Sequence, residues 1–272
     1  MIFKKLLWAI KRHPFLYLTR FRLLSKNSDI QDIDAFNYNV LNSKADIPKY
    51  FHEINAKIFK DGKPDTDFEV VKQLSIWLKH HIKGGPGLSE PSEQALHTML
   101  SGKGGVCSDM AQIFNNFCVI NDIKVREWGT TSAPFNRDFG GHSFNEVFCR
   151  EMNQWVLIDV SYTLVFHNAA AEPLSVVALY QLNRAGKPVS YFGFNGSVVE
   201  EAIIHKNYLN PGITPFLICD YRNSTYDYFL KLTRPYVPVF MTHFGIYLLQ
   251  RSYHYRFPLD DYHNIFSKPS SS

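Results

Sequence analysis

Three residues of this chain, Cys107, His142 and Asp159, have the types and the order that a thiol nucleophile requires. A thiol attacks a carbonyl carbon only as thiolate, so its pKa must fall below the free value of about 8.5. Cys107 follows Gly104 and Gly105 and is predicted to lie in the first turn of a helix. There, unpaired N–H groups and the positive end of the helix dipole favour an anion. The sequence therefore predicts a nucleophilic cysteine beside N–H groups that could also hold an oxyanion.

His142 and Asp159 supply the two other groups that a reactive thiolate needs. An imidazole would form the ion pair with the thiolate and donate a proton to the leaving group. A carboxylate beside the imidazole would fix its tautomer and orientation. We therefore predict a catalytic Cys-His-Asp triad at these three positions.

The spacing of His142 and Asp159 allows a geometric prediction. Both residues fall on consecutive predicted strands joined by a short loop at 150–153, which pairs Cys149 with Gln154. Because side chains alternate between the two faces of a strand, this register places His142 and Asp159 on one face as diagonal neighbours. A slip by one residue would separate them, so the hypothesis depends on the register.

The elements that must position these residues are predicted from caps and periodicity. Thr66 and Glu69 form a capping-box pattern, and the residues after Cys107 are hydrophobic nearly all round, which indicates a central helix. Residues 29–63 are weakly periodic, and the signals weaken again beyond Ser161. Helices are predicted at about 67–82, 92–100, 107–121, 174–183 and 223–232, and strands at 123–131, 142–149 and 155–160. Helices followed by an antiparallel meander indicate an α+β fold.

Three sequence motifs resemble those of a known family. The stretches GVCSDMA at 105–111, HSFNEV at 142–147 and WVLID at 155–159 are similar, in order and spacing, to the motifs of the bacterial transglutaminase-like superfamily. Three ordered motifs are more specific than any one of them. The resemblance extends from about residue 68 to 161. It implies a papain-like, transglutaminase-like core in which a helix bearing Cys packs on an antiparallel sheet bearing His and Asp.

The resemblance also implies an activity and roles for individual residues. Cys107 would be the nucleophile, His142 the general acid and base, and Asp159 the orienting carboxylate. The reaction would be acyl transfer or amide hydrolysis through a thioacyl-enzyme, with a peptide or protein amide as substrate and no cofactor. Residues expected around the site are Trp155, Asn145 and Glu146, and those expected to supply a further oxyanion donor are Trp77 or Gln94.

Other interpretations of the same residues remain open. The chain could be a binding or scaffold module that keeps the fold without turnover. His80, His81 and His97 could suggest a metal hydrolase with Cys107, but adjacent helical histidines diverge by about 100°, which is poor ligand geometry. The aromatic stretch at 221–229 could stack on a sugar ring, although burial is the commoner role for such residues.

The basic character of the chain is concentrated at its N-terminus. Residues 1–28 contain seven Lys and Arg and no acidic residue. The other 22 of the 29 basic residues face 25 acidic residues, so the remainder has a formal charge of −3. No basic face for nucleic acid is therefore expected. The first twelve residues have an amphipathic helical pattern that fits a peripheral membrane contact and a helix docked on the body equally well.

The organisation and the compartment follow from the same features. We predict a basic N-terminal segment at 1–28, a catalytic core at 29–165, and a helical, aromatic-rich extension at 166–272 that packs on the core. The four cysteines are widely spaced, which suits a reducing compartment. The expected location is therefore cytoplasmic, with membrane association through residues 1–28 as an open alternative.

Overall fold

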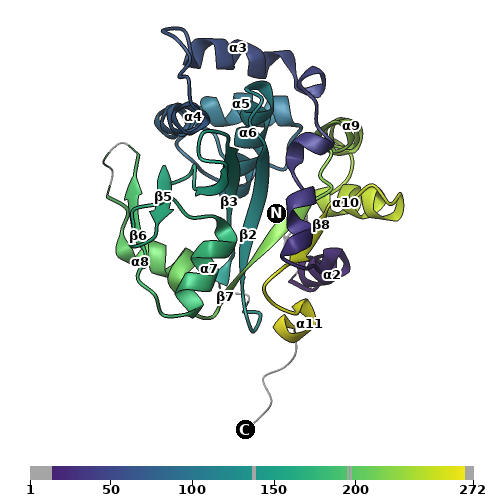
Figure 1. The fold of residues 1–272 in the computed structure, drawn as a ribbon. Helices are drawn as coiled ribbons and strands as arrows, with labels where there is room; N and C mark the ends of the chain where they lie inside the picture. Colours follow the sequence, from purple (N-terminus) through teal and green to yellow (C-terminus); the bar gives the residue numbers. More distant parts are fainter. Residues whose placement is uncertain (1–13, 137–138, 195, 197, 267–272) are drawn as a thin grey trace.

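A six-stranded sheet forms the centre of the molecule (Figure 1), in the order β1-β8-β7-β2-β3-β4. The computed structural model describes residues 14–136, 139–194, 196 and 198–266. The strands pair antiparallel except β1 and β8, which are parallel. Their bounds are β1 Ser25–Asn27, β2 Val125–Ser132, β3 His142–Cys149, β4 Gln154–Ile158, β7 Ile213–Cys219 and β8 His254–Phe257. A separate small sheet pairs β5 (Leu164–His167) with β6 (Ser190–Gly193).

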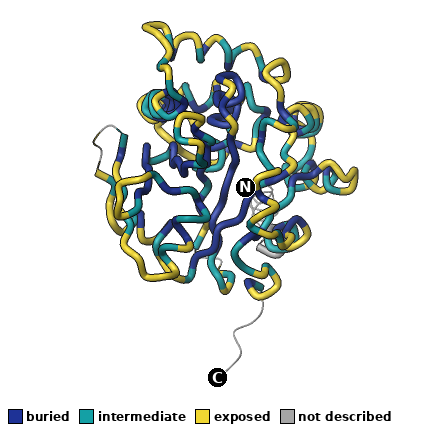
Figure 2. Tube along the Cα trace, viewed as in Figure 1, coloured by how far each residue is buried: buried dark blue, intermediate teal, exposed yellow. Residues whose placement is uncertain are grey.

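Helices cover both faces of this sheet, so its central strands are buried in Figure 2. The first helical group is α3 (Lys49–Ile58), α4 (Asp67–His81), α5 (Ser92–Leu100) and α6 (Cys107–Ile120). It shares one hydrophobic cluster with Val125, Val147 and Val156. The opposite face packs against α7 (Val176–Arg184), α8 (Glu201–Ile204) and the π-helical turn η5 (His205–Leu209). The other helical segments are α2 Pro14–Leu24, η1 Gln31–Ala35, η2 Tyr38–Val40, η3 Lys44–Asp46, α9 Asn223–Thr233, α10 Val239–Leu248 and α11 Tyr262–Ile265.

Helix α6 is central, as its sequence predicts. Phe114, Phe117 and Cys118 are fully buried between the sheet and the other helices. Burying a Phe side chain contributes about 1.5–3 kcal/mol relative to leaving it in water. These anchors fix the helix axis, and therefore the position of its first residue, Cys107.

The predicted α+β fold class and the register of the β3–β4 hairpin are confirmed. Cys149 pairs with Gln154, and the ladder continues to Asn145 opposite Ile158. Helices α4, α5, α6, α7 and α9 begin and end within about two residues of their predicted bounds, which is the usual uncertainty of helix ends. The side chain of Thr66 accepts the backbone N–H of Glu69, as expected for a helix cap.

Several elements differ from the sequence prediction. Helix α3 lies in a stretch that is only weakly periodic, and β7 and β8 lie beyond Ser161, where no strand is expected. Most of β7 is buried, so its sequence ITPFLIC lacks the alternation that identifies a half-exposed strand. Residues 166–272 therefore contribute strands to the central sheet as well as helices.

The structure bears only in part on the expectations for the N-terminus and for membranes. The amphipathic pattern of the first twelve residues lies outside the described residues, which begin at Pro14. Across the described part of the chain, no helix has both the length and the apolar character that a membrane span requires.

Candidate active site

Two glycines bring the chain sharply into α6. Gly105 has φ of +111°, and a Cβ added there would lie 2.6 Å from Cε of Met99. A Cβ on Gly104 would lie 2.5 Å from Cδ2 of Leu88 and 2.9 Å from the carbonyl oxygen of Pro86. The backbone N–H of Gly105 donates to that same oxygen at 2.9 Å. The close approach of the 86–88 loop thus requires glycine before Cys107.

Asp109 holds the loop and the helix start together. Its Oδ2 accepts the backbone N–H of Val106 at 3.0 Å and that of Leu88 at 3.1 Å. A carboxylate in the first helical turn also complements the helix dipole. Asp109 therefore caps the start of α6, and Cys107 occupies the first residue of this helix.

His142 and Asp159 meet at the ends of β3 and β4. Nε2 of His142 lies 2.7 Å from Oδ2 of Asp159, and both side chains are buried. The other oxygen of Asp159 accepts the backbone N–H of Ser161 at 2.8 Å. Because Nε2 is used by the carboxylate, Nδ1 is the ring nitrogen left for the thiol of Cys107.

The thiol and the ring change each other's proton affinity. Burial raises the pKa of the Cys107 thiol, but a hydrogen bond to His142, the charge of that ring and the backbone N–H of Ser143 together lower it below its ordinary value. Burial lowers the pKa of His142, whereas Asp159 and the Cys107 sulfur outweigh burial and raise it to about 10. Both shifts favour a thiolate–imidazolium pair at neutral pH.

Sequence reasoning missed a tyrosine that completes this arrangement. The hydroxyl of Tyr208, from η5, donates to Oδ2 of Asp159 at 2.5 Å, and its ring packs edge-on against His142. Tyr162 also packs against the His142 ring, with centroids 5.6 Å apart. Tyr208 lies 49 residues beyond Asp159 in a segment without a motif, so only the tertiary fold reveals this contact.

Asn145 and Trp155, which are expected around the site, both lie in structural positions. Asn145 lies at the interface of β3 with α6, where its Nδ2 donates to the carbonyl of Ala111 at 3.1 Å and to Oδ1 of Asn115 at 2.8 Å. Trp155 lies near the opposite end of the hairpin, opposite Phe148 and under the guanidinium of Arg126. Trp155 therefore supports the sheet and not the triad.

Glu146 also has a structural position. It is buried, and its carboxylate accepts hydrogen bonds from Arg126, from Nε1 of Trp128 and from the backbone N–H of Val176. These contacts join β2, β3 and the start of α7 beneath the site.

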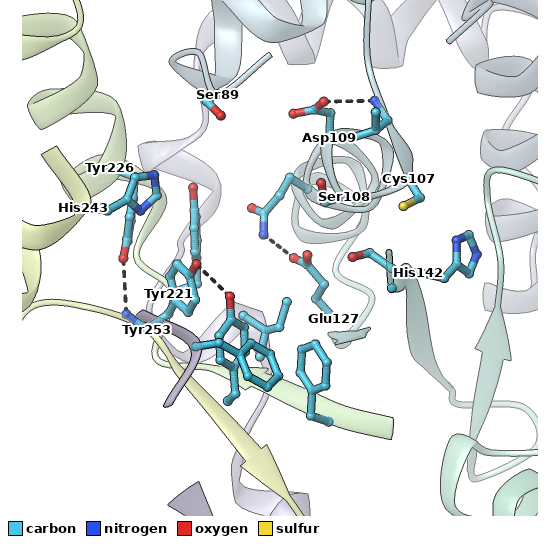
Figure 3. A pocket seen from close by; sticks show the side chains of 18 of the residues that line it. Ser89, Cys107, Ser108, Asp109, Glu127, His142, Tyr221, Tyr226, His243 and Tyr253 are labelled. Atoms are coloured by element: carbon cyan, nitrogen blue, oxygen red, sulfur yellow. Dashed lines mark hydrogen bonds between the residues drawn. The ribbon is translucent and has the colours of Figure 1, made fainter. Parts of the chain in front are cut away.

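A cavity of about 860 Å³ opens beside Cys107 and His142. Figure 3 shows the thiol and the imidazole on one side of it, and Tyr221, Tyr226, Tyr253 and His243 on the other. Neither Trp77 nor Gln94 is among the described residues that line it. Trp77 stacks on His81 at 3.9 Å between ring centroids, and Gln94 is exposed. With neither of these side chains in the cavity, the backbone N–H groups at the start of α6 are the candidate oxyanion donors.

The other cysteines and the histidines of α4 lie outside this site. Cys118, Cys149 and Cys219 are buried, and burial raises the pKa of each thiol. His80 and His81 are exposed at the end of α4, and Nδ1 of His81 lies 2.8 Å from the carbonyl of Trp77. Across 14–266, leaving aside the undescribed positions, no three potential metal ligands come together.

Part of the aromatic stretch at 221–229 has a place in the cavity. Tyr221 and Tyr226 line it and stack on each other with centroids 4.5 Å apart, whereas Tyr228 is exposed. Their phenol rings are largely buried by their neighbours, but they also form the wall that faces the thiol across the cavity.

The match to a protein family agrees with the motif positions. The family model for the core of the transglutaminase-like superfamily matches residues 53–160. No curated protein matches the chain. A solved structure from Cytophaga hutchinsonii, described provisionally as a cysteine protease, is 16% identical, with a TM-score of 0.33. That alignment covers 53% of this chain and 46% of the other, so the chain spans about half the length of that protein.

Proposed function

Because residues 53–160 are a transglutaminase-like core, we propose that this protein is a thiol-dependent enzyme that transfers or hydrolyses acyl groups through Cys107, His142 and Asp159. The family match supports a thiol-dependent enzyme in general. The specific reaction and the three roles are inferred from the contacts at the site. A peptide or protein amide is the proposed substrate class.

One observation carries this proposal: the His142 ring is hydrogen-bonded to the buried carboxylate of Asp159 on one side, and on the other it interacts with the thiol of Cys107 and lowers the pKa of that thiol. A buried histidine with a merely structural role needs one such partner. The chain from helix start to ring to buried carboxylate is the arrangement that activates a thiol. The first turn of α6 adds N–H groups beside the sulfur.

The proposed reaction has two halves. The Cys107 thiolate attacks the carbonyl carbon, and the resulting oxyanion is held by N–H groups at the start of α6. The C–N bond then breaks as the imidazolium of His142 gives its proton to the leaving amine, which leaves a thioacyl-enzyme. In the second half an amine or water attacks the thioester, His142 takes the proton of the attacking group, and the C–S bond breaks to restore the thiolate.

Thiol titration tests the activated pair directly. Iodoacetamide near pH 7 should alkylate Cys107 at least about tenfold faster than Cys118, Cys149 or Cys219, because a thiolate is the reacting species. His142→Ala should remove most of this difference, while His80→Ala, at an exposed position on α4, should leave it unchanged. Site-resolved mass spectrometry gives the four rates.

Equal labelling of all four cysteines in the folded protein would overturn the proposal and favour a module that keeps the fold without turnover. If labelling is selective, mass spectrometry of a thioacyl adduct trapped on Cys107 would identify the acyl group. Addition of amines during turnover then separates transfer from hydrolysis, because a transferase forms a new amide at the expense of the free acid.

A further inference from the structure

Glu127 is a buried carboxyl group in the same cavity as the thiol. It lies on β2, is 3% exposed, and lines the cavity together with Cys107. In Figure 3 its carboxylate lies between the Cys107 and His142 side and the wall formed by Tyr221, Tyr226 and Tyr253. The proposed acyl-transfer steps give Glu127 no role, although burying an ionisable group requires compensating contacts.

The groups around Glu127 present more acceptors than donors. Its Oε2 accepts from Nε2 of Gln112 and, at 3.0 Å, from Nδ2 of Asn115. No hydrogen bond within the described residues reaches its other oxygen. Oε1 of Gln112, which also lines the cavity, is buried and lacks a hydrogen-bond partner there. A buried acceptor without a donor is costly, so Oε1 of Gln112 is suited to a ligand that brings an N–H group.

The charges beside Glu127 favour a cation. Burial, followed by the charges of Cys107 and Asp109, raises its pKa to about 8. Arg20 is the one Lys or Arg among the described lining residues, and it contacts His243 and Tyr253 on the wall opposite the thiol. A cation bound at Glu127 would balance the charge of the carboxylate in place of the proton that burial, followed by the charges of Cys107 and Asp109, otherwise makes it retain.

We propose that Glu127 and Gln112 form a binding site for a cationic nitrogen, an amine or a guanidinium, next to Cys107. The carboxylate of Glu127 would supply the negative charge, and its Oε1 together with Oε1 of Gln112 would accept the N–H groups of the ligand. The inference rests on the proposed function, because it assigns to the same cavity a preference for substrates that carry a positive group. That group could belong to the acyl donor or to the amine that accepts the acyl group.

Charged thiol reagents test the site without requiring turnover. Cys107 attacks the sulfenyl sulfur of a methanethiosulfonate, a disulfide forms and methanesulfinate leaves. We expect the aminoethyl (cationic) reagent to modify Cys107 faster than the uncharged methyl reagent, after correction for their rates with free cysteine. Glu127→Gln should lower this ratio about tenfold, because it removes a charge-assisted hydrogen bond.

A variant of a second carboxylate in the cavity is the matched control, because it distinguishes binding at Glu127 from the overall electrostatic potential of the cavity. Glu90 also lines the cavity, but its carboxylate accepts from Thr98 and pairs with Arg234. Glu90→Gln should therefore leave the ratio nearly unchanged. Gln112→Met, on the half-buried face of α6, provides a second variant that should also lower the ratio if Glu127→Gln does not fold.

The outcomes distinguish the two proposals. If Cys107 reacts with the uncharged reagent no faster than the buried cysteines do, the proposed function fails. If Cys107 is reactive but the cationic preference is absent, or is equally reduced by the Glu127 and Glu90 variants, the cation site is overturned and the proposed function stands.

Ester substrates then identify which reactant carries the cation. If Glu127→Gln lowers kcat/KM for a nitrophenyl ester with a cationic acyl group and not for its uncharged isostere, the cation belongs to the acyl donor. If it instead slows the capture of an uncharged thioacyl group by added amines, the cation belongs to the acceptor. Unchanged rates for both classes would contradict a role for Glu127 in substrate binding.

Discussion

At the scale of single residues, the distinctive feature of the site is a carboxylate shared by two donors. Oδ2 of Asp159 lies 2.7 Å from Nε2 of His142 and also accepts the hydroxyl of Tyr208. Burial, followed by the charge of Asp159, raises the pKa of Tyr208 well above its usual value, so its hydroxyl stays protonated and can donate. The phenol therefore restricts the carboxylate and takes part of its charge.

We predict that Tyr208→Phe lowers kcat/KM by about tenfold, since a buried hydrogen bond to a charged group is worth about 1.5–3 kcal/mol. The pH dependence of kcat/KM distinguishes an electrostatic role of Tyr208 from a packing role. The pKa of His142 is raised to about 10, so turnover should decline as pH rises through that value and the ring loses the proton that the leaving group needs. Without the Tyr208 hydroxyl, the Asp159 carboxylate would stabilise the protonated His142 ring more strongly and raise its pKa further. The decline of activity in Tyr208→Phe should therefore move to higher pH. A loss of activity with an unmoved profile would indicate a packing role alone.

How far the site could be predicted depends on sequence separation. The contact between His142 and Asp159 follows from a short turn and the alternation of side chains, and both are local. Tyr208 and Glu127 have no such local signal, because their positions depend on how η5 packs under the sheet and how α6 crosses β2. Local periodicity predicts which face a side chain takes within its own element but not which distant element covers it.

At the scale of elements, the contact between β2 and α6 includes an ionisable group that couples stability to pH. Burial, then the charges of Cys107 and Asp109, raises the pKa of Glu127 from 4.5 to about 8. The folded protein thus binds a proton between these values that the unfolded chain has released. Stability falls with rising pH wherever the folded state holds more protons. Glu127 therefore weakens the β2–α6 contact progressively from about pH 4.5 to 8.

Glu127→Gln should remove this part of the pH dependence, because glutamine does not ionise. The free energy of unfolding of the variant, relative to that of the parent, should rise by up to about 4 kcal/mol between pH 5 and pH 9. This figure follows because each pKa unit of difference between the folded and unfolded states corresponds to about 1.36 kcal/mol. Urea unfolding at both pH values measures this difference. Parallel pH curves for the two proteins would show that Glu127 titrates near its ordinary value.

At the scale of the whole molecule, strands from distant parts of the chain complete the sheet. The strand β1 lies near the N-terminus, while β7 and β8 come from the last third of the chain, and β2 to β4 lie between them in sequence. The cavity is lined on one side by α6 and on the other by residues of α2, α9 and α10 (Figure 3). Residues outside the family match at 53–160 thus form the wall that faces the thiol.

The outer helices α2 and α10 bear on one of the two interpretations that the sequence leaves open for residues 1–28, a peripheral membrane contact. Helix α2 contacts α10 through Arg20 and His243, whose side-chain nitrogens lie 2.9 Å apart. Large apolar side chains on α10 are exposed, namely Met241, Phe244 and Leu248. Helix α10 therefore presents an exposed apolar surface next to α2, and apolar surface together with basic residues is typical of proteins that bind anionic membrane surfaces.

We predict that replacing Lys4, Lys5, Lys11 and Arg12 by glutamine lowers co-sedimentation with anionic vesicles, because each basic residue near such a surface contributes about 1 kcal/mol. Substitution is preferable to deleting residues 1–28, since Phe21 and Leu24 are buried and their loss would destabilise the fold. Vesicles of neutral lipid and high salt are the controls, because both remove the electrostatic attraction. Equal co-sedimentation of the parent and the variant with anionic vesicles would leave the second interpretation, in which the basic helix docks on the body of the protein with its charges in water.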